Sequence, residues 1–551
     1  MDNNLLQELK KVIKGDVLTD AETLITYSHD ASLFEIKPQA IVFPKNEDDV
    51  KAIIKFANLN KKNNPSLSLT ARSAGTDMSG GSINDSIIVA FEKYFNNAPR
   101  INNNIATTQP GVYYRDFEKE TLGHDLIFPS YPASREICAM GGIVNNNSGG
   151  EKSLQYGKTE KYVKRIKAVL SDGNTYEFKK LNKEELEEKM SLKTFEGEIY
   201  RKIYKLINDN YTEIMNAKPQ VSKNSAGYFL WNVYDKEKET FDLTKLFVGA
   251  QGTLGFLLEA DIELVPIHKH REMLIIFLHD LSHLSEIIKH VLSLNPESFE
   301  SYDDNTLKLA LRYFPEFAKQ LGLYGMIQAS LAFLPAFISL FTGRNLPKLV
   351  LQVDFTSNDV KEIEEKVATL KAKLKPLNPQ TQIAKDNAEK RYWLVRRESF
   401  NLLRKKIRDK HTAPFIDDFV IKPEYIEQVV TQITNILKKH PEFIYTVAGH
   451  VGDGNFHIIP LVDIADPKVR NNIPIIAKEV YDLIHEYHGS ITGEHNDGLI
   501  RTPYLQQMYG EKIISLFEET KQIFDPNRIF NPRKKVFGDL DYAMSHIRQN
   551  W

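Results

Sequence analysis

A strand-like run, Ser66-Leu67-Ser68-Leu69-Thr70, leads into the glycine-rich stretch Arg72-Ser73-Ala74-Gly75-Thr76-Asp77-Met78-Ser79-Gly80-Gly81. Small side chains in such a stretch let successive backbone N–H groups approach an anion closely, as in loops that cradle a pyrophosphate. The stretch is not a P-loop, because no Gly-Lys-Ser/Thr follows, and it lacks the Gly-x-Gly-x-x-Gly pattern of dinucleotide-binding turns. Taken alone, it indicates either a phosphate-binding loop or an ordinary tight turn.

Two further stretches of the same character favour the phosphate-binding interpretation. They are Ala139-Met140-Gly141-Gly142-Ile143-Val144-Asn145-Asn146-Asn147-Ser148-Gly149-Gly150 and Phe247-Val248-Gly249-Ala250-Gln251-Gly252-Thr253-Leu254-Gly255-Phe256. Each is followed by a strand-like run, whereas apolar residues from Glu47 to Asn58 recur at helical spacing. Three stretches that expose backbone N–H groups suit a long, extended ligand. Such a ligand could have its phosphates bound by one stretch and a flat ring bound by another. The alternative is three tight turns between strands and helices.

A second kind of site is indicated by the run Gly449-His450-Val451-Gly452-Asp453-Gly454-Asn455-Phe456-His457 and by the later pair Glu494-His495. Asp-Gly between strand-forming residues predicts a two-residue hairpin turn, which would place His450 directly opposite His457. Opposed side chains share one face with Cβ atoms roughly 5 Å apart, so two imidazoles can chelate one divalent ion. Glu494 would complete a three-ligand site with an open position, and His495 would stand beside it as a general base. The alternative is an ordinary hairpin with surface-exposed histidines.

The composition is that of a globular enzyme. The 551 residues can form two or more domains with large cores. Lys plus Arg number 71 against 73 Asp plus Glu, so no charge bias suggests nucleic acid as a partner. The single cysteine, Cys138, excludes internal disulfides and any cysteine-ligated iron–sulfur cluster, and it agrees with a reducing, cytoplasmic location. The N-terminus lacks a basic region before an apolar core, so no secretory signal is expected.

These motifs carry a family resemblance. The three glycine-rich stretches resemble the flavin-binding domain of the vanillyl-alcohol oxidase and p-cresol methylhydroxylase superfamily. The runs Gly449 to His457, Gly493 to Gly498 and Phe524 to Pro532 resemble the FAD-linked D-2-hydroxyacid dehydrogenases. That group includes D-lactate dehydrogenases, D-2-hydroxyglutarate dehydrogenases and the flavin subunit of glycolate oxidase. The motifs occur in the family's order along most of the chain.

The resemblance implies an α+β architecture. Residues 1–34 would form an N-terminal helical extension, and residues 35–268 a two-subdomain FAD-binding domain of the p-cresol methylhydroxylase type. Residues 269–488 would form a cap domain that carries a large antiparallel sheet over the flavin ring. Residues 489–551 would return to the flavin domain.

The resemblance also implies which residues bind FAD. The pyrophosphate contacts fall on one group, Ser73, Ala74, Gly75, Thr76, Asp77 and Gly80. The rest of the cofactor would be lined by Gly111, Pro132, Met140, Gly141, Gly142, Asn147, Ser148 and Gly149, with Phe256 and Asn531 near the ring. The first glycine-rich stretch contains no histidine and no cysteine, so we expect non-covalent FAD.

The family's metal ligands fall on His450, His457 and Glu494, the set already indicated by the hairpin. A 2-hydroxyacid, with D-lactate the expected substrate, would chelate a bound Zn²⁺ or Mn²⁺, which lowers the pKa of its hydroxyl. His495 would take that proton as the Cα hydride passes to flavin N5. Asp497 or Asn455 would orient these groups.

A cation is expected to bind the substrate carboxylate. Arg396 lies in Arg391-Tyr392-Trp393-Leu394-Val395-Arg396-Arg397-Glu398, which resembles the family's Trp-x-x-Arg stretch. Bidentate geometry favours arginine for this role. The alternatives are an exposed helical arginine at this position, or Arg397 in the same role.

Two departures from the family bear on function. The family's Gly-Glu-His-Gly is Gly493-Glu494-His495-Asn496 here, and asparagine tolerates the positive φ that the glycine is expected to need. No cysteine-rich iron–sulfur domain follows, so the electrons would leave to quinone or to a separate iron–sulfur or other redox protein.

An apolar segment could mark where the electrons pass to their acceptor. Every residue from Leu321 to Gly343 is uncharged, and basic residues predominate on both sides. Pro335 in its middle argues against a membrane span. The pattern is typical of peripheral contact with the inner face of the cell membrane; the alternatives are a homodimer interface and a buried cap helix.

Two other functions remain open at this point. One is a flavin-binding electron-transfer subunit without substrate chemistry, and the other is an ether-lipid synthase-like enzyme on the same fold. The intact set of three histidines and one glutamate favours the dehydrogenase, because a non-catalytic subunit has no physical need for it.

Overall fold

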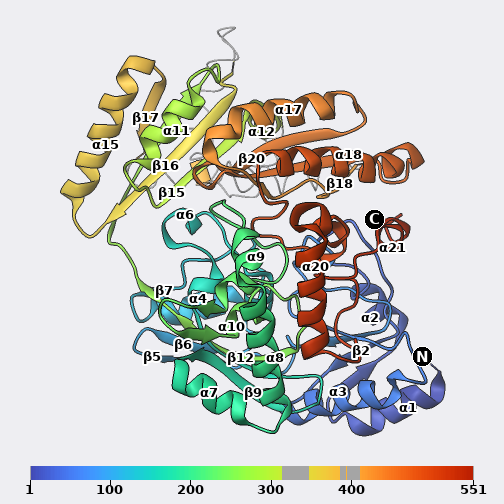
Figure 1. Ribbon diagram of the computed structural model, residues 1–551. Coiled ribbons are helices and arrows are strands. Elements are labelled where there is room, and N and C mark those ends of the chain that lie inside the picture. Colours follow the sequence, from blue (N-terminus) through green and yellow to red (C-terminus); the bar gives the residue numbers. More distant parts are fainter. Residues whose placement is uncertain (1, 313–345, 385–391, 394–409, 550–551) are drawn as a thin grey trace.

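The computed structural model describes residues 2–312, 346–384, 392–393 and 410–549. Within these residues the chain forms sheets of four, seven and eight strands and a two-stranded pair of β7 (Leu126–Ile127) and β13 (Val265–Pro266). The eight-stranded sheet and its helices form the upper part of Figure 1, and the smaller sheets form the lower part. The apolar segment from Leu321 to Gly343, and both Arg396 and Arg397, lie outside the described residues.

The four-stranded sheet positions the first glycine-rich stretch. Its order is β1 (Asp16–Leu18), β2 (Ala40–Phe43), β4 (Ile87–Ala90) and β3 (Leu69–Arg72), and the last three strands are parallel. Strands β2 and β4 are buried along their whole length, as expected for a parallel sheet covered on both faces. Helix α3 (Glu47–Lys61) connects β2 to β3 and begins where the Asn46 side chain accepts the N–H of Asp49. The stretch from Arg72 onward therefore leaves the carboxyl edge of this sheet.

The seven-stranded sheet is antiparallel at every pair between described strands. Its order is β10 (Tyr234–Asp235), β11 (Thr240–Asp242), β9 (Thr175–Leu181), β8 (Val163–Val169), β12 (Phe256–Glu263), β6 (Ile105–Thr108) and β5 (Arg100–Asn102). Helices of this lower part are α1 (Asn3–Val12), α2 (Ala21–Thr26), α4 (Tyr114–Leu122), α5 (Met140–Asn146), α6 (Ser153–Tyr156), α7 (Lys183–Ser191), α8 (Phe195–Asp209), α9 (Tyr211–Asn216) and α10 (Thr244–Phe247).

The eight-stranded sheet is also antiparallel throughout its described pairs. Its order is β17 (Gln380–Ala384), β14 (His270–Leu278), β16 (Leu349–Ser357), β15 (Ser298–Asp303), β20 (Ile444–His450), β21 (Asn455–Val462) and β18 (His411–Thr412), with β19 (Phe419–Val420) also paired to β21. Its helices are α11 (Leu284–Leu292), α12 (Asp304–Arg312), α15 (Val360–Leu374), α17 (Ile426–Lys438) and α18 (Pro467–Glu486). The expected α+β architecture with a large antiparallel sheet is confirmed. The domain boundaries given above stay a prediction.

The C-terminal segment contacts the lower part of the molecule. It contains α19 (Gly498–Arg501), α20 (Leu505–Phe524) and α21 (Leu540–Ser545), and α20 runs alongside α8 (Figure 1). The backbone N–H of Leu69 on β3 donates to Ile529, and the N–H of Asn531 donates back to Leu69. This segment is therefore an extra neighbour of the four-stranded sheet.

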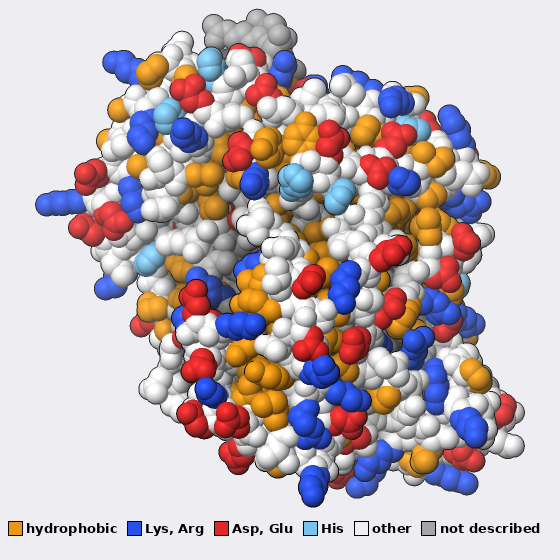
Figure 2. Space-filling model, viewed as in Figure 1, with side chains coloured by type: hydrophobic (Ala, Val, Ile, Leu, Met, Phe, Trp, Pro, Cys, Tyr) orange, Lys and Arg blue, Asp and Glu red, His pale blue; other side chains and the backbone are white. Residues whose placement is uncertain are grey.

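None of the described helices combines the length and the apolar character needed to cross a membrane. Figure 2 shows acidic and basic side chains mixed over one face of the molecule, on the upper part as well as the lower.

Candidate active site

The hairpin of β20 and β21 brings His450 and His457 together, but not in the predicted register. His450 pairs with Asn455 and Ala448 pairs with His457, because a 3₁₀ turn over Val451–Asp453 replaces the two-residue turn. The predicted direct opposition of the two histidines is wrong by two positions. A shift of two positions keeps both side chains on the same face of the sheet. The two rings therefore still meet, with their centroids 5.3 Å apart and nearly perpendicular.

Each imidazole is held by a buried carboxylate through Nδ1. Nδ1 of His450 lies 2.7 Å from Oε1 of Glu300 on β15. Nδ1 of His457 lies 3.0 Å from Oδ1 of Asp417, and Nδ1 of His495 lies 2.7 Å from Oδ2 of the same residue. The last contact is an ion pair rather than an aligned hydrogen bond. Nε2 of each ring is then the nitrogen left for chemistry.

Glu494 lies against this group of histidines. Its Oε1 is 3.4 Å from Nε2 of His450 and accepts a hydrogen bond of 2.6 Å from Nζ of Lys223. Burial alone would raise the pKa of Glu494, but Lys223 and His450 outweigh it and hold this pKa well below the usual range. Glu494 is therefore an ionised carboxylate that faces imidazole nitrogen.

Asp418 fixes the loop that carries Glu494 and His495. Its carboxylate accepts the backbone N–H of Glu494 at 2.8 Å and of His495 at 2.7 Å. It also accepts the hydroxyl of Thr492 at 2.6 Å and the side-chain amide of Asn455 at 3.1 Å. Asn455, predicted to orient these groups, thus contacts the carboxylate that holds the loop of Glu494 and His495.

The sequence interpretation did not include Asp417 and Asp418. Both side chains are fully buried, although they lie between Ile416 and Phe419 in an apolar run. Two adjacent acidic residues within an apolar run could have indicated a functional position, because a buried charge needs a partner.

The two aspartates also set the charge state of His495. Burial disfavours a charged imidazole, but Asp417 and Asp418 outweigh it and raise the pKa of His495 to about 9. A cation bound beside Glu494 would act in the opposite direction, because like charges disfavour the protonated ring.

Ligating atoms converge here within the described residues. Single atoms of Asp418, His457, Glu494 and His495 all lie within 4.8 Å of one another. Asp418 suits a metal least among them, because backbone and side-chain donors already occupy its carboxylate. His450 fits better, since its Nε2 faces Glu494.

The first glycine-rich stretch is half-buried from Ser73 to Met78 and organised from within. The carboxylate of Asp77 accepts the hydroxyl of Ser79, the side-chain amide of Asn146 and, through a very short contact, the N–H of Gly81. Asp77 therefore folds the loop, whereas a direct contact of its carboxylate with a phosphate would be repulsive.

The second stretch begins with a short helix, α5. A Cβ on Gly141 would lie 2.5 Å from Oγ of Ser73, so the helix packs tightly on the first stretch. A Cβ on Gly142, in contrast, would meet no atom of the described residues within 4 Å. Gly142 thus presents bare backbone to open space.

The other predicted flavin residues divide into two groups. Ser148 follows α5 and donates its N–H to Ile143, Pro132 lies beside Gly150, and a Cβ on Gly149 would lie 3.2 Å from Oε1 of Glu494. Met140, Asn147, Phe256 and Asn531 are fully or almost fully buried, and Gly111 packs against backbone carbonyls of Phe91 and Phe95.

Two of these buried residues have visible structural roles. Phe256 packs on Phe91 and Phe530. Asn531 donates to the carbonyls of Gly81 and Gln251, so it ties the first stretch to the third. The described structure assigns these two side chains to packing and bracing.

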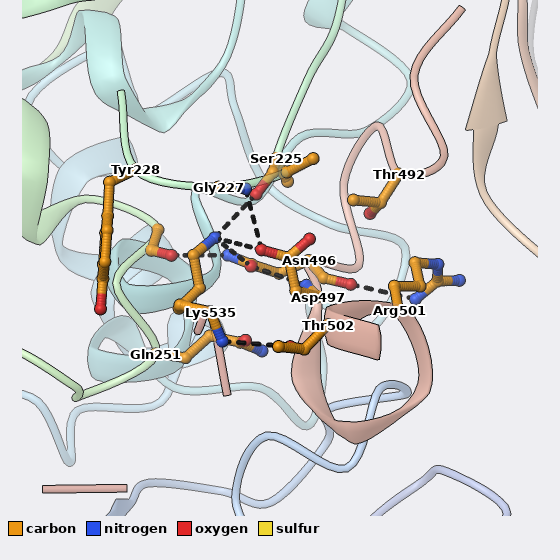
Figure 3. A network of polar contacts seen from close by, with 12 residues as sticks. Ser225, Gly227, Tyr228, Gln251, Thr492, Asn496, Asp497, Arg501, Thr502 and Lys535 are labelled. Carbon is orange, nitrogen blue, oxygen red and sulfur yellow. Dashed lines mark hydrogen bonds and ion pairs between the residues drawn. The ribbon is translucent and has the colours of Figure 1, made fainter. Parts of the chain in front are cut away.

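Asn496, where the family has glycine, joins the loop of His495 to the glycine-rich stretches. Its φ of 67° confirms the expected left-handed backbone. Its amide donates to the carbonyls of Gly249 and Asn146, and its oxygen accepts from Nζ of Lys535 (Figure 3). Asp497 pairs with Lys535 at 2.7 Å, so the described structure does not place it as the orienting group for the histidines.

The start of the Trp-x-x-Arg stretch lies on the large sheet. Gln352 on β16 donates to the carbonyl of Tyr392 at 3.1 Å. Gln352 is the ladder partner of Glu300, which holds His450. Tyr392 thus contacts the sheet face that carries Glu300.

Two family models match the chain. The FAD binding domain matches residues 38–179, and the domain described as FAD linked oxidases, C-terminal domain, matches residues 267–535. The chain belongs to the FAD-linked oxidases. This finding confirms the recognised family and the FAD-binding domain.

Similarity to individual proteins supports the assignment of the chain to the FAD-linked oxidases. D-2-hydroxyglutarate dehydrogenase of Escherichia coli (strain K12) is 27% identical over 542 residues, which are 96% of this chain and 51% of that protein. The chain thus spans about half the length of the first curated relatives it matches. D-lactate dehydrogenase of Archaeoglobus fulgidus is 24% identical over 538 residues, 96% of this chain and 99% of that protein. The structure of p-cresol methylhydroxylase has a TM-score of 0.68 at 15% identity, covers 98% of this chain and 97% of its own, and shows the same fold.

The residues of this FAD-linked oxidase fit the cofactor. Gly142 exposes backbone where a side chain would have room, next to the half-buried loop from Ser73 onward. A glycine that faces open space within a helix costs stability relative to alanine, so it needs a reason such as close approach of a ligand.

Proposed function

We propose that this FAD-linked oxidase oxidises a D-2-hydroxyacid to the 2-oxoacid with a divalent metal as a second cofactor. The observation that carries the proposal is the convergence of His450, His457 and Glu494, with His495 beside them. A flavin-binding subunit without substrate chemistry would not need three imidazoles and an ionised carboxylate in one group whose members are buried or half-buried.

Nε2 of His450, Nε2 of His457 and the carboxylate of Glu494 would hold the metal. Both imidazoles have Nδ1 engaged by a carboxylate, which is the arrangement usual for metal-ligating histidines. Mixed imidazole and carboxylate ligation suits Zn²⁺ or Mn²⁺. When bound, the metal would supply a Lewis acid that lowers the pKa of the substrate hydroxyl.

His495 would act as the general base. Its ring stacks on His457 with centroids 5.1 Å apart, so it lies next to the proposed ligands. Asp417 holds its Nδ1, and Nε2 would take the proton of the substrate hydroxyl. When bound, FAD would supply the acceptor for the hydride of the Cα–H bond.

Arg396 would bind the substrate carboxylate by its planar guanidinium, with Arg397 as the rival. Tyr392 and Trp393, just before it, contact the sheet face that carries Gln352 and Arg271. Arg396→Met should weaken substrate binding and spare metal content. Normal binding by this variant would transfer the role to Arg397 or to another cation.

D-lactate is the substrate that the sequence favours, and the names of the relatives add D-2-hydroxyglutarate. Both share the hydroxyl and carboxylate that the proposed site would bind. The test is anaerobic mixing of the purified, metal-loaded flavoprotein with D-lactate, D-2-hydroxyglutarate and glycolate, with L-lactate as the control. Bleaching of the flavin absorbance by one D-acid but not by L-lactate is expected. A flavin that no 2-hydroxyacid bleaches would refute the proposal.

Quinone is the electron acceptor that we propose, with the apolar segment from Leu321 to Gly343 as the membrane contact. Replacing Phe337 and Phe341 with Asp should abolish sedimentation with anionic liposomes and quinone reduction, while substrate-driven bleaching persists. If the wild type does not sediment with liposomes and is a dimer, whereas the variant is a monomer, the segment is a subunit interface. A separate redox protein would then be the expected acceptor.

A further inference from the structure

One carboxylate serves two imidazoles of this site. The side chain of Asp417 is fully buried, with Oδ1 3.0 Å from Nδ1 of His457 and Oδ2 2.7 Å from Nδ1 of His495. The two rings stack on each other at an interplanar angle of 23°. His450 differs, because its Nδ1 contacts a separate carboxylate, that of Glu300.

The backbone around Asp417 is pinned. Its carbonyl accepts a hydrogen bond of 2.6 Å from Arg501, whose side chain is fully buried. Arg501 also donates to the carbonyl of Asn496, the residue after His495 (Figure 3). The same guanidinium thus connects the backbone of Asp417 to the loop of His495 and holds the two segments together.

This geometry decides the tautomer of both rings. An ionised carboxylate can only accept, and a nitrogen lone pair at 2.7–3.0 Å from it would be repelled. The carboxylate therefore favours a proton on each Nδ1, through a hydrogen bond at His457 and through an ion pair at His495. Each neutral ring then presents a lone pair at Nε2, the atom that either a metal ligand or a base requires.

We propose that Asp417 is a positioning residue that sets the tautomer of His457 and His495 together, and so couples the proposed metal ligand to the proposed base. This inference rests on the proposed function and deepens it. The two oxygens of Asp417 face Nδ1 of two different imidazoles, and this shared contact is the observation behind the proposal.

The decisive variant is Asp417→Asn. A carboxamide has one oxygen that accepts and one NH₂ that donates, so it can satisfy the Nδ1–H of only one ring. The ring that faces the NH₂ must move its proton to Nε2 and lose its function there. An equivalent change of tautomer explains the large loss of rate when the aspartate of a serine-protease triad becomes asparagine.

The direct measurement is the protonation of the ring nitrogens in the Zn²⁺-loaded holoenzyme, by ¹⁵N NMR of histidine-labelled protein. Signals of the two rings are assigned with His457→Gln and His495→Gln. In the wild type, Nδ1 of both rings should carry a proton, and in Asp417→Asn only one should. A wild-type ring with a bare Nδ1, or a variant that keeps both protons, would overturn the proposal. The wild-type measurement decides even if the variant does not fold.

Metal content and single-turnover bleaching then identify the ring that changed. If His457 changes, metal affinity should fall about 10- to 100-fold, the usual effect of losing an outer partner of a ligand. If His495 changes, metal should remain while flavin reduction slows roughly 10²- to 10⁴-fold. A variant with metal content and rate within about threefold of wild type would also overturn the proposal.

Glu300→Gln is the matched control. It makes the same carboxylate-to-amide change at the residue that faces Nδ1 of His450, where the amide oxygen can still accept from that ring. Both Nδ1 protons of His457 and His495 should therefore persist. Because ring protonation needs no substrate turnover, the result is independent of which hydroxyacid, if any, the enzyme oxidises.

Discussion

Nζ of Lys223 lies 2.6 Å from Oε1 of Glu494, although 271 positions separate the two residues in the sequence. The same Nζ lies 3.0 Å from Oδ2 of Asp453, at the tip of the β20–β21 hairpin. All three side chains are almost completely buried. One cation between two buried carboxylates therefore braces the Glu494 loop against the hairpin that carries the histidines.

Lys223→Met should destabilise the metal-free protein by about 3–5 kcal/mol, the usual cost of removing one partner from a buried ion pair. The loss should be smaller with Zn²⁺ bound, because the metal would then compensate the charge of Glu494. Denaturant unfolding with EDTA and with excess Zn²⁺ measures both values. Lys218→Met, which removes an exposed lysine nearby, is the control and should change little. Equal losses in both conditions would place the metal away from Glu494.

His457→Ala should abolish metal binding and leave FAD in place. The substitution removes a proposed ligand, so affinity should fall by more than the roughly 10- to 100-fold typical of an outer partner. FAD should stay, because the glycine-rich stretches belong to the lower part of the molecule. Metal analysis and the flavin spectrum of the same sample decide the outcome. The exposed His485 gives the control variant, His485→Ala, which should keep both cofactors. Joint loss of FAD and metal would show that the site is misplaced.

The hairpin illustrates what the sequence could predict. Alternation along a strand fixes which face a side chain occupies, so His450 and His457 were expected on one face and are found there. The pairing register of β20 and β21 depends on the turn between them. At this turn, tertiary contacts prevailed over the local preference of Asp-Gly for a two-residue turn. Gly454 accepts from the N–H of Ile421, which favours the longer 3₁₀ turn.

The partners of the histidines could not be predicted in the same way. Asp417, Glu300 and Lys223 lie 40, 150 and 271 positions from His457, His450 and Glu494, respectively, and no local pattern links such pairs. The residues proposed to carry out chemistry have recognisable motifs, whereas the residues that hold them are specified by the fold.

His495→Asn should slow flavin reduction by roughly 10²- to 10⁴-fold, because it removes the proposed base and keeps part of its hydrogen bonding. Substrate affinity and metal content should change little, since none of the proposed ligands is altered. Stopped-flow bleaching at several substrate concentrations separates the rate from the affinity. His488→Asn is the control, because His488 is exposed and asparagine tolerates its positive φ. A loss confined to affinity would instead assign His495 to substrate binding.

Gly142→Ala should separate the folding of α5 from the binding of FAD. Within a helix, alanine is more favourable than glycine by roughly 0.5–1 kcal/mol, and here its Cβ would meet no described atom within 4 Å. The apoprotein should therefore melt at the same or a slightly higher temperature, whereas FAD affinity should fall because the methyl group occupies space that the cofactor needs. Gly141→Ala is the matched neighbour, and it should destabilise the apoprotein, since its Cβ would lie 2.5 Å from Oγ of Ser73. Thermal melting of the apoproteins and FAD titration distinguish the two effects. Unchanged FAD affinity in Gly142→Ala would place the cofactor away from this face of α5.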